Sequence, residues 1–103
     1  MARALSAATA LVADALARGF HHGFDILDAT GLPSGTVYPI LRRLERDGHA
    51  RSRWEGVRLA QREQRPPRRY YELTQTGEEL VALARARFPM LSAPPARARV
   101  RRA

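Results

Sequence analysis

Apolar residues follow helical spacing at the start of the chain. They recur three or four positions apart between residues 4 and 18, which predicts a helix, and Gly19 is placed to end it. The residues of this apolar stripe are Leu5, Ala8, Val12, Ala15 and Leu16. A short second helix is predicted over residues 23–30, and Gly31 can supply its left-handed ending. The residues expected to be buried from this second helix are Phe24, Ile26 or Leu27.

A third helix is predicted after a tight turn at residues 31–33. Ser34 stands at its start, where the hydroxyl can accept a free backbone N–H and cap the helix. Pro39 lies early in the helix, where the loss of one N–H costs less than it would further along, and Gly48 ends the helix. The apolar repeat of this helix, at i, i+4 and i+7, consists of Val37, Leu41 and Leu44.

Short strands are predicted after the third helix, over residues 51–55 and 68–73. The residues between them, 56–67, are polar and rich in arginine and end in a Pro-Pro pair, so we expect an extended hairpin loop. A last helix is predicted over residues 75–88, with Thr74 as its cap and Pro89 closing it. The strand residues expected to pack against the protein are Trp54, Tyr71 and Leu73.

These elements predict a mainly α fold with a small β-wing, a winged helix-turn-helix. We divide the chain into a winged helix-turn-helix domain at residues 1–74, a C-terminal dimerisation helix at 75–91 and a basic disordered tail at 92–103. The tail is assigned to disorder because it holds prolines and arginines and almost no large apolar group.

Positive charge is concentrated in the centre of the chain and in the tail. The formal net charge is +8, and every basic residue other than histidine is arginine. Residues 42–69 hold ten arginines against four acidic residues, and residues 97–102 hold four more arginines. This distribution is typical of a surface that binds a polyanion, although a solvated charged face remains an alternative.

The exposed face of the third helix carries the candidate binding residues. Its start offers free N–H groups and small polar side chains that can approach a phosphate, and its later turns offer arginines that can pair with guanine or phosphate. We expect it to enter the major groove of DNA, with the wing arginines beside it on phosphates or in the minor groove. The predicted DNA-binding residues are Ser34, Gly35, Thr36, Tyr38, Pro39, Arg42, Arg43, Arg53, Arg68 and Arg69. Further wing arginines in this expectation are Arg51, Arg58, Arg62 and Arg65.

The composition argues against several other classes of protein. With no cysteine, a disulfide framework and a thiolate metal site are excluded, and no apolar run is long enough for a membrane span. Asp14 interrupts the apolar start of the chain, which disfavours a secretory signal and makes the cytoplasm the expected compartment. The three histidines and the acidic residues form no recognisable catalytic or metal-binding set, so we expect neither an enzyme nor a cofactor.

Four segments of the chain resemble the PadR family of bacterial transcriptional regulators. The resemblance covers roughly residues 5–80, and Phe24 departs from it, because the family more often has tyrosine there. The matching segments are residues 22–26 (His-Gly-Phe-Asp-Ile), residues 30–45, residues 52–55 (Ser-Arg-Trp-Glu), and residues 68–74 with Gly77. The resemblance implies a winged helix-turn-helix regulator that binds double-stranded DNA.

PadR-like proteins are implied by the same resemblance to be homodimers, joined mainly through C-terminal helices with help from the first helix. They often repress genes and release DNA when a small molecule binds, but no residue here identifies such an inducer. The apolar stripe that we assign to the dimer interface consists of Leu80, Ala84, Phe88 and Leu91. Because no second C-terminal helical segment follows, we do not expect a large ligand pocket between subunits.

Two other functions fit the same pattern of residues. A winged helix can bind a protein partner through its wing and tail, and an arginine-rich chain can coat RNA or DNA without sequence preference. Specific binding to an inverted-repeat operator, as expected of a repressor, would distinguish the chain from both.

Overall fold

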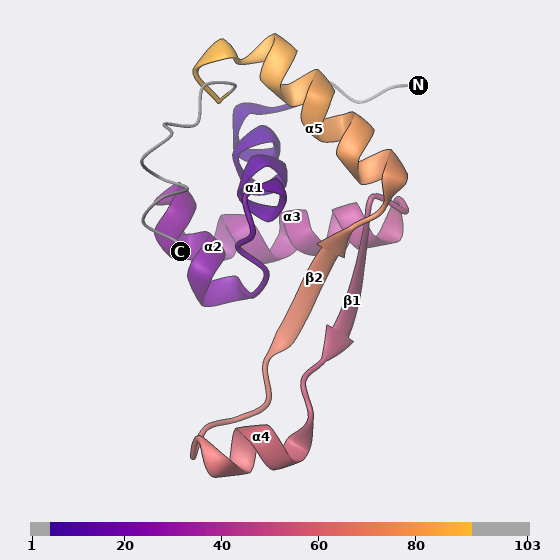
Figure 1. Ribbon diagram of the computed structural model, residues 1–103. Coiled ribbons are helices and arrows are strands. Elements are labelled where there is room, and N and C mark those ends of the chain that lie inside the picture. Colours follow the sequence, from indigo (N-terminus) through magenta and orange to yellow (C-terminus); the bar gives the residue numbers. More distant parts are fainter. Residues whose placement is uncertain (1–4, 92–103) are drawn as a thin grey trace.

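The computed structural model describes residues 5–91, and these form a helical body from which a β-hairpin projects (Figure 1). The predicted winged helix-turn-helix is confirmed, while the predicted tail lies outside the described residues. The elements in chain order are α1 (Ala7–Ala17), α2 (Gly23–Thr30), α3 (Ser34–Arg46), β1 (Ala50–Trp54), α4 (Val57–Arg62), β2 (Arg69–Leu73), α5 (Gln75–Arg87) and a 3₁₀ helix (Pro89–Leu91).

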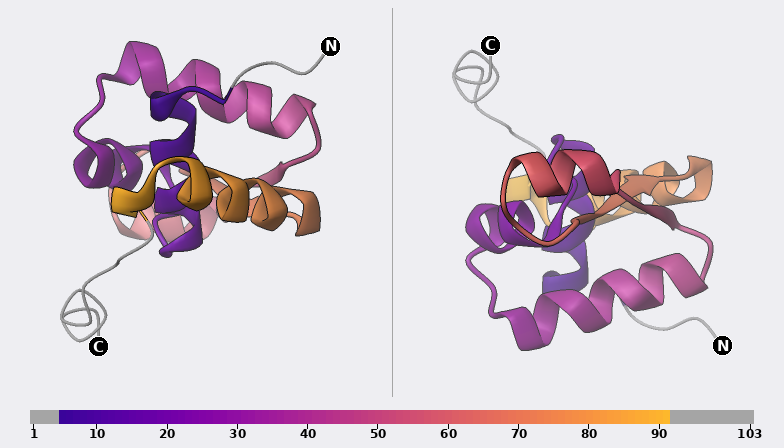
Figure 2. Two further views of the ribbon diagram at one scale, coloured as in Figure 1. Left: turned by 90° about the horizontal axis from the view of Figure 1, so that it is seen from above. Right: turned by 90° about the horizontal axis from the view of Figure 1, so that it is seen from below.

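Helix α1 lies at the centre of the body, between α3 and α5 (Figure 2). Ser6 caps its start, and the Ser6 hydroxyl accepts a hydrogen bond from the backbone N–H of Thr9 at 3.1 Å. Because neighbours pack on several sides, its buried surface is wider than the predicted single stripe. Its buried residues are Ala10, Val12, Ala13, Asp14, Ala15 and Leu16.

Helices α2 and α3 and their connecting turn match the predicted motif. Gly31 follows α2 in the left-handed conformation at φ 73°. The predicted cap was wrong, because Pro33 already has the extended conformation that precedes a helix and Ser34 is the first residue of α3. No side chain caps α3 by a hydrogen bond. Its buried face consists of Val37, Ile40, Leu41 and Leu44.

One of the residues expected to be buried in α2 faces solvent instead. Ile26 is fully covered and Leu27 packs against the core, but Phe24 is 69% exposed. Two residues correspond to about 200° of rotation on an α-helix, so Phe24 points away from the side on which Ile26 meets the core. A helix this short packs on one side only, and the prediction for Phe24 was wrong.

Strands β1 and β2 pair antiparallel, in a register that runs from Ala50 opposite Leu73 to Trp54 opposite Arg69. Alternate residues of β2 face the body, so Tyr71 is buried and Leu73 packs against the core, as predicted. The segment before α2 extends this edge, because the backbone N–H of Tyr71 donates to the carbonyl oxygen of His21 at 2.8 Å. The hairpin is therefore anchored to the body at its base and free of it toward its tip (Figure 1).

The tip of the hairpin contains a helix where an extended loop was predicted. Helix α4 spans Val57–Arg62, and Ala60 is its buried residue. Glu55, at the base of this tip, accepts hydrogen bonds from the side chain of Arg65 and from the backbone N–H of Arg68, the latter at 2.8 Å. These bonds join the two ends of the segment, which lets the residues between them form a compact turn of helix.

Helix α5 packs along α1 and is capped as predicted, with the hydroxyl of Thr74 accepting from the backbone N–H of Gly77 at 3.2 Å. The carboxylate of Asp14 in α1 accepts from Arg18 at 2.9 Å and from Arg85 of α5 at 2.8 Å. This packing already covers part of the stripe that was assigned to the dimer interface. Ala84 is completely buried within the single chain, so its assignment to a subunit contact was wrong.

Candidate nucleic-acid interface

The side of α3 that faces away from the core is open to solvent. Its exposed residues are Ser34, Gly35, Arg42 and Arg46, and the half-buried Pro39 lies among them. Within residues 5–91, the side chain of Arg42 takes part in no hydrogen bond or ion pair, and that of Arg46 makes only a long contact of 3.7 Å with Asp47. We refer to these five residues as the α3 face. The predicted residues that it brings together are Ser34, Gly35, Pro39 and Arg42.

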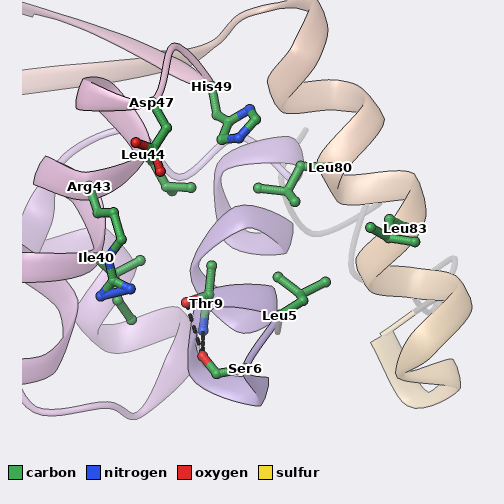
Figure 3. Close-up of a pocket in the computed structure, with 10 residues that line it drawn as sticks. All are labelled: Leu5, Ser6, Thr9, Ile40, Arg43, Leu44, Asp47, His49, Leu80 and Leu83. Atoms are coloured by element: carbon green, nitrogen blue, oxygen red, sulfur yellow. Dashed lines mark hydrogen bonds between the residues drawn. The ribbon is translucent and has the colours of Figure 1, made fainter. Parts of the chain in front are cut away.

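Three residues predicted for this face, Thr36, Tyr38 and Arg43, lie elsewhere on the helix. Tyr38 is half-buried against the core, and its ring occupies the space beside Gly23, where an added Cβ would lie 2.1 Å from the tyrosine oxygen. Arg43 is half-buried and lines a cleft between α1, α3 and α5, together with Thr9 and Leu80 (Figure 3). Arg43 follows Arg42 by 100° around the helix, which is enough to turn it toward α1.

Thr36 is also half-buried, on the same side of α3 as Arg43. The cleft that Arg43 lines has a volume of about 290 Å³. Its apolar lining comes from Leu5, Ile40, Leu44, Leu80 and Leu83 (Figure 3). Helix α5 lines one side of this cleft, and no residue from 51 to 73 of the wing lines it. The cleft therefore does not belong to the α3 face.

Arg69 joins the wing to the end of α3. Its Nε donates to the hydroxyl of Ser52 on β1 at 3.0 Å, and its NH2 group donates to the carboxylate of Glu45 on α3 at 3.3 Å. Ser52 in turn donates to the same carboxylate at 2.7 Å. The guanidinium also lies over the rings of Trp54 and Tyr71, 5.5 Å and 5.9 Å from their centroids. Arg69 is thus a connection between wing and helix, made through its Nε and one of its two NH2 groups.

The other predicted wing arginines are distributed over different surfaces. Arg53 lies on the opposite face of the hairpin from Arg69, 3.8 Å from the carboxylate of Glu72. Arg68 is half-buried and reaches Nε2 of His22 at 3.4 Å. Arg65, expected at the exposed tip, is instead held by Glu55. The arginines of the wing whose side chains are exposed and take part in no hydrogen bond or ion pair among the described residues are Arg51, Arg58 and Arg62.

Comparison with known proteins identifies the chain. The family of PadR-like transcriptional regulators matches residues 14–83, which include α2, α3 and the whole wing. The chain belongs to the PadR-like family. A search of curated proteins finds no match.

Solved structures share the PadR-like fold. The crystal structure of smu.1704 from Streptococcus mutans UA159 aligns with a TM-score of 0.67 at 23% identity, covering 90% of this chain and 88% of that one. A Streptococcus transcriptional regulator aligns with a TM-score of 0.63 at 24% identity, over 82% and 83% of the two chains. A PadR-like transcription factor from Bacteroides fragilis aligns with a TM-score of 0.56 at 26% identity, over 82% and 85%.

Two negative findings apply to the described part of this PadR-like chain. No helix within residues 5–91 has the length and apolar character needed to cross a membrane. Within the same residues, no three histidine, aspartate or glutamate side chains gather as ligands for a metal ion.

The wing tip of the PadR-like chain holds a carboxylate with an altered pKa. Hydrogen bonding from the Arg65 guanidinium lowers the pKa of Glu55 to about 2, from an ordinary value of 4.5. The ionised form is therefore stabilised by folding. A group with a lowered pKa contributes stability that is present above pH 4.5 and is lost as the pH falls toward 2.

We expect Glu55→Gln to be less stable than the wild type at pH 7, with a difference that shrinks as the pH falls from 4.5 toward 2. Glutamine keeps the shape of the protonated acid but cannot carry the charge that Arg65 stabilises. Urea unfolding at a series of pH values measures the difference. Glu79→Gln, an exposed site on α5, is the control and should stay close to the wild type throughout. A Glu55→Gln difference that does not depend on pH would contradict the assignment.

Proposed function

We propose that this chain is a sequence-specific transcriptional repressor that binds an inverted-repeat operator in DNA as a homodimer, in the cytoplasm. The observation that supports it best is the α3 face, where the free guanidinium of Arg42 stands two helical turns beyond the small residues Ser34 and Gly35 at the helix start. Small residues allow close approach to the DNA backbone, and an unpaired guanidinium can bind guanine or phosphate. Membership of the PadR-like family gives the general role in transcription.

In this proposal the α3 face enters the major groove and the wing follows the adjacent phosphates. Arg42 reads a base edge, while Ser34 and Gly35 position the start of the helix on the backbone. The wing arginines Arg53 and Arg68 contact phosphates. Arg69 acts on DNA through the wing that it holds in place.

Dimer formation is proposed through α5 and the residues beside it. Leu83 is 49% exposed and Met90 89% exposed, and both are large apolar side chains on the outside of the C-terminal region. Leu80, Phe88 and Leu91 remain only half-buried in the single chain. A second copy that covers these residues would bury apolar surface that is otherwise in contact with water.

Selection of DNA fragments by the purified protein tests the operator and the dimer together. We expect the selected fragments to share two inverted half-sites about 34 Å apart, one helical turn of DNA. Sedimentation should show two chains on each selected duplex. Leu83→Asp should sediment as a monomer and bind the duplex weakly, because a charge would replace a buried apolar contact, while Val57→Asp on the wing tip should leave the sedimentation of the free protein unchanged.

The same experiment separates the alternatives. Fragments with no common sequence would indicate a nonspecific nucleic-acid coat, and no retained DNA would favour a protein-interaction module. A wild-type protein that stays monomeric on a selected duplex would rule the dimer out.

A further inference from the structure

Two aromatic residues that sequence reasoning placed in the protein interior are exposed beside the same hollow. Trp54, at the end of β1, is 62% exposed, so the prediction that it packs was wrong. Phe24, at the start of α2, is 69% exposed. Both line a hollow of about 380 Å³ between the body and the wing, together with Tyr38, Tyr71, Arg68 and Arg69.

The register of the hairpin explains why Trp54 is uncovered. Ala50, Ser52 and Trp54 share the strand face that looks toward the body, and Ala50 is buried in the core. Trp54 continues this face beyond the body, because the hairpin projects past it (Figure 1). The side chain therefore has the inward orientation of a core residue with no core beneath it. Its only described ring contact is the guanidinium of Arg69.

The hollow adjoins the α3 face. Tyr38, which lines it, precedes Arg42 by one helical turn, so the two residues lie next to each other along the helix. A duplex bound by the α3 face and the wing has to pass over the space between them. The part of DNA that it would present there is a sugar–phosphate strand, because the bases are stacked inside the duplex.

Resting on the proposed function, we propose that this hollow receives one sugar–phosphate strand of the bound DNA, with Trp54 and Phe24 packing against deoxyribose and Arg68 facing a phosphate. Deoxyribose is the apolar part of the backbone and matches exposed rings, and the guanidinium matches the charge beside it.

A small anion is the other occupant that rings and arginines could hold, but two of the three arginines that line the hollow are already engaged within the protein. Specific pockets direct several polar groups at their ligand. Here Arg65 is held by Glu55, and Arg69 by Glu45 and Ser52. No buried side-chain nitrogen or oxygen within residues 5–91 lacks a partner. The surface therefore suits an extended strand better than a small molecule.

The single tryptophan of the chain makes the test direct, since all indole fluorescence comes from Trp54. Titration of the full-length protein with a selected duplex should change the emission of Trp54 and reduce its quenching by acrylamide, as the ring becomes covered. Trp54→Ala should weaken binding of that duplex about tenfold, which corresponds to about 1.4 kcal/mol. Phe24→Ala should weaken it in the same direction, and Trp54→Phe should retain most of the affinity.

Val57→Ala is the matched control, because Val57 lies on the same wing, is 60% exposed and does not line the hollow. It should bind like the wild type. Thermal unfolding checks that each variant is folded. Because the replaced side chains are exposed, the unfolding temperature should hardly change.

Tight, selective binding of the duplex with unchanged Trp54 quenching and an unaffected Trp54→Ala variant would overturn the inference and leave the proposed function standing. Failure of every duplex to bind would contradict both this inference and the proposed function. An equal loss in Val57→Ala would assign the effect to the wing in general and not to the hollow. Protection of Trp54 by benzoate, used as a small planar anion, without protection by DNA would identify a small-molecule site and also overturn the inference.

Discussion

Replacing Asp14 with alanine is expected to destabilise the protein by about 3 kcal/mol, because it leaves two arginines without their common partner. Only 4% of the Asp14 side chain is exposed, and its oxygens accept from Arg18 and Arg85. Removal of one partner from a buried ion pair costs about 3–5 kcal/mol. The side chains of both arginines remain 31% exposed and keep part of their hydration. The expected loss of stability therefore lies at the lower end of this range.

Urea unfolding at one fixed protein concentration measures this loss, since dimer formation would make the apparent stability depend on concentration. Asp47→Ala is the control. Asp47 is half exposed and lies 3.7 Å from Arg46 at the surface, so its removal should change stability by about 0.5 kcal/mol or less. Equal losses in the two variants would show that the contact with Arg85 does not hold α5 on α1.

The order and type of the main elements could be predicted because each carries a local signal. The spacing of Val37, Leu41 and Leu44 specifies one side of α3, and the left-handed Gly31 sets the turn before it. The hydroxyl of Thr74 caps α5 as expected. Each of these features depends on residues within a few positions of one another, so the sequence alone determines them.

Helix α4 was missed although its residues contain a signal. Val57, Leu59 and Ala60 are compatible with a helix, and Gly56 precedes them. The arginines and the Pro-Pro pair nearby favour an extended loop instead. What stabilises the compact conformation is the bond between Glu55 and Arg65, ten residues apart, and periodicity does not reveal a contact of that kind.

The candidate site was predicted only in part, because the exposure of a side chain depends on which other elements of the fold pack over it. Periodicity separated Arg42 from the core but could not show that Arg43 turns toward α1 or that Tyr38 packs over Gly23. Trp54 and Phe24 have apolar rings, and composition alone assigns such rings to the interior. Their exposure follows from the length of the hairpin and the shortness of α2, which are properties of the assembled fold.

Removing the connection between Arg69 and Glu45 is expected to reduce the ratio of operator to random-DNA affinity about tenfold, or about 1.4 kcal/mol. Arg69 links β1, β2 and α3 through Ser52 and Glu45, so its loss would let the wing change its angle to the helix. Specific DNA requires one arrangement of helix and wing, while random DNA tolerates several. The ratio should therefore fall more than the affinity for random DNA.

The paired variants Arg69→Ala and Glu45→Gln distinguish this role from a direct phosphate contact. If Arg69 positions the wing, Arg69→Ala removes the connection and Glu45→Gln weakens it by removing the charge, so both should lower the ratio, Arg69→Ala more strongly. If Arg69 binds phosphate, Arg69→Ala should reduce the slope of log affinity against log salt by about 0.9. In that case Glu45→Gln, which removes a negative charge beside the guanidinium, should strengthen binding.

Titrations of operator and random duplexes over a salt series measure the affinity ratio and the salt slope, with Arg58→Ala at the exposed wing tip as the reference for a lost phosphate contact. A salt slope reduced by about 0.9 in Arg69→Ala, together with stronger operator binding by Glu45→Gln, would show that Arg69 contacts DNA directly.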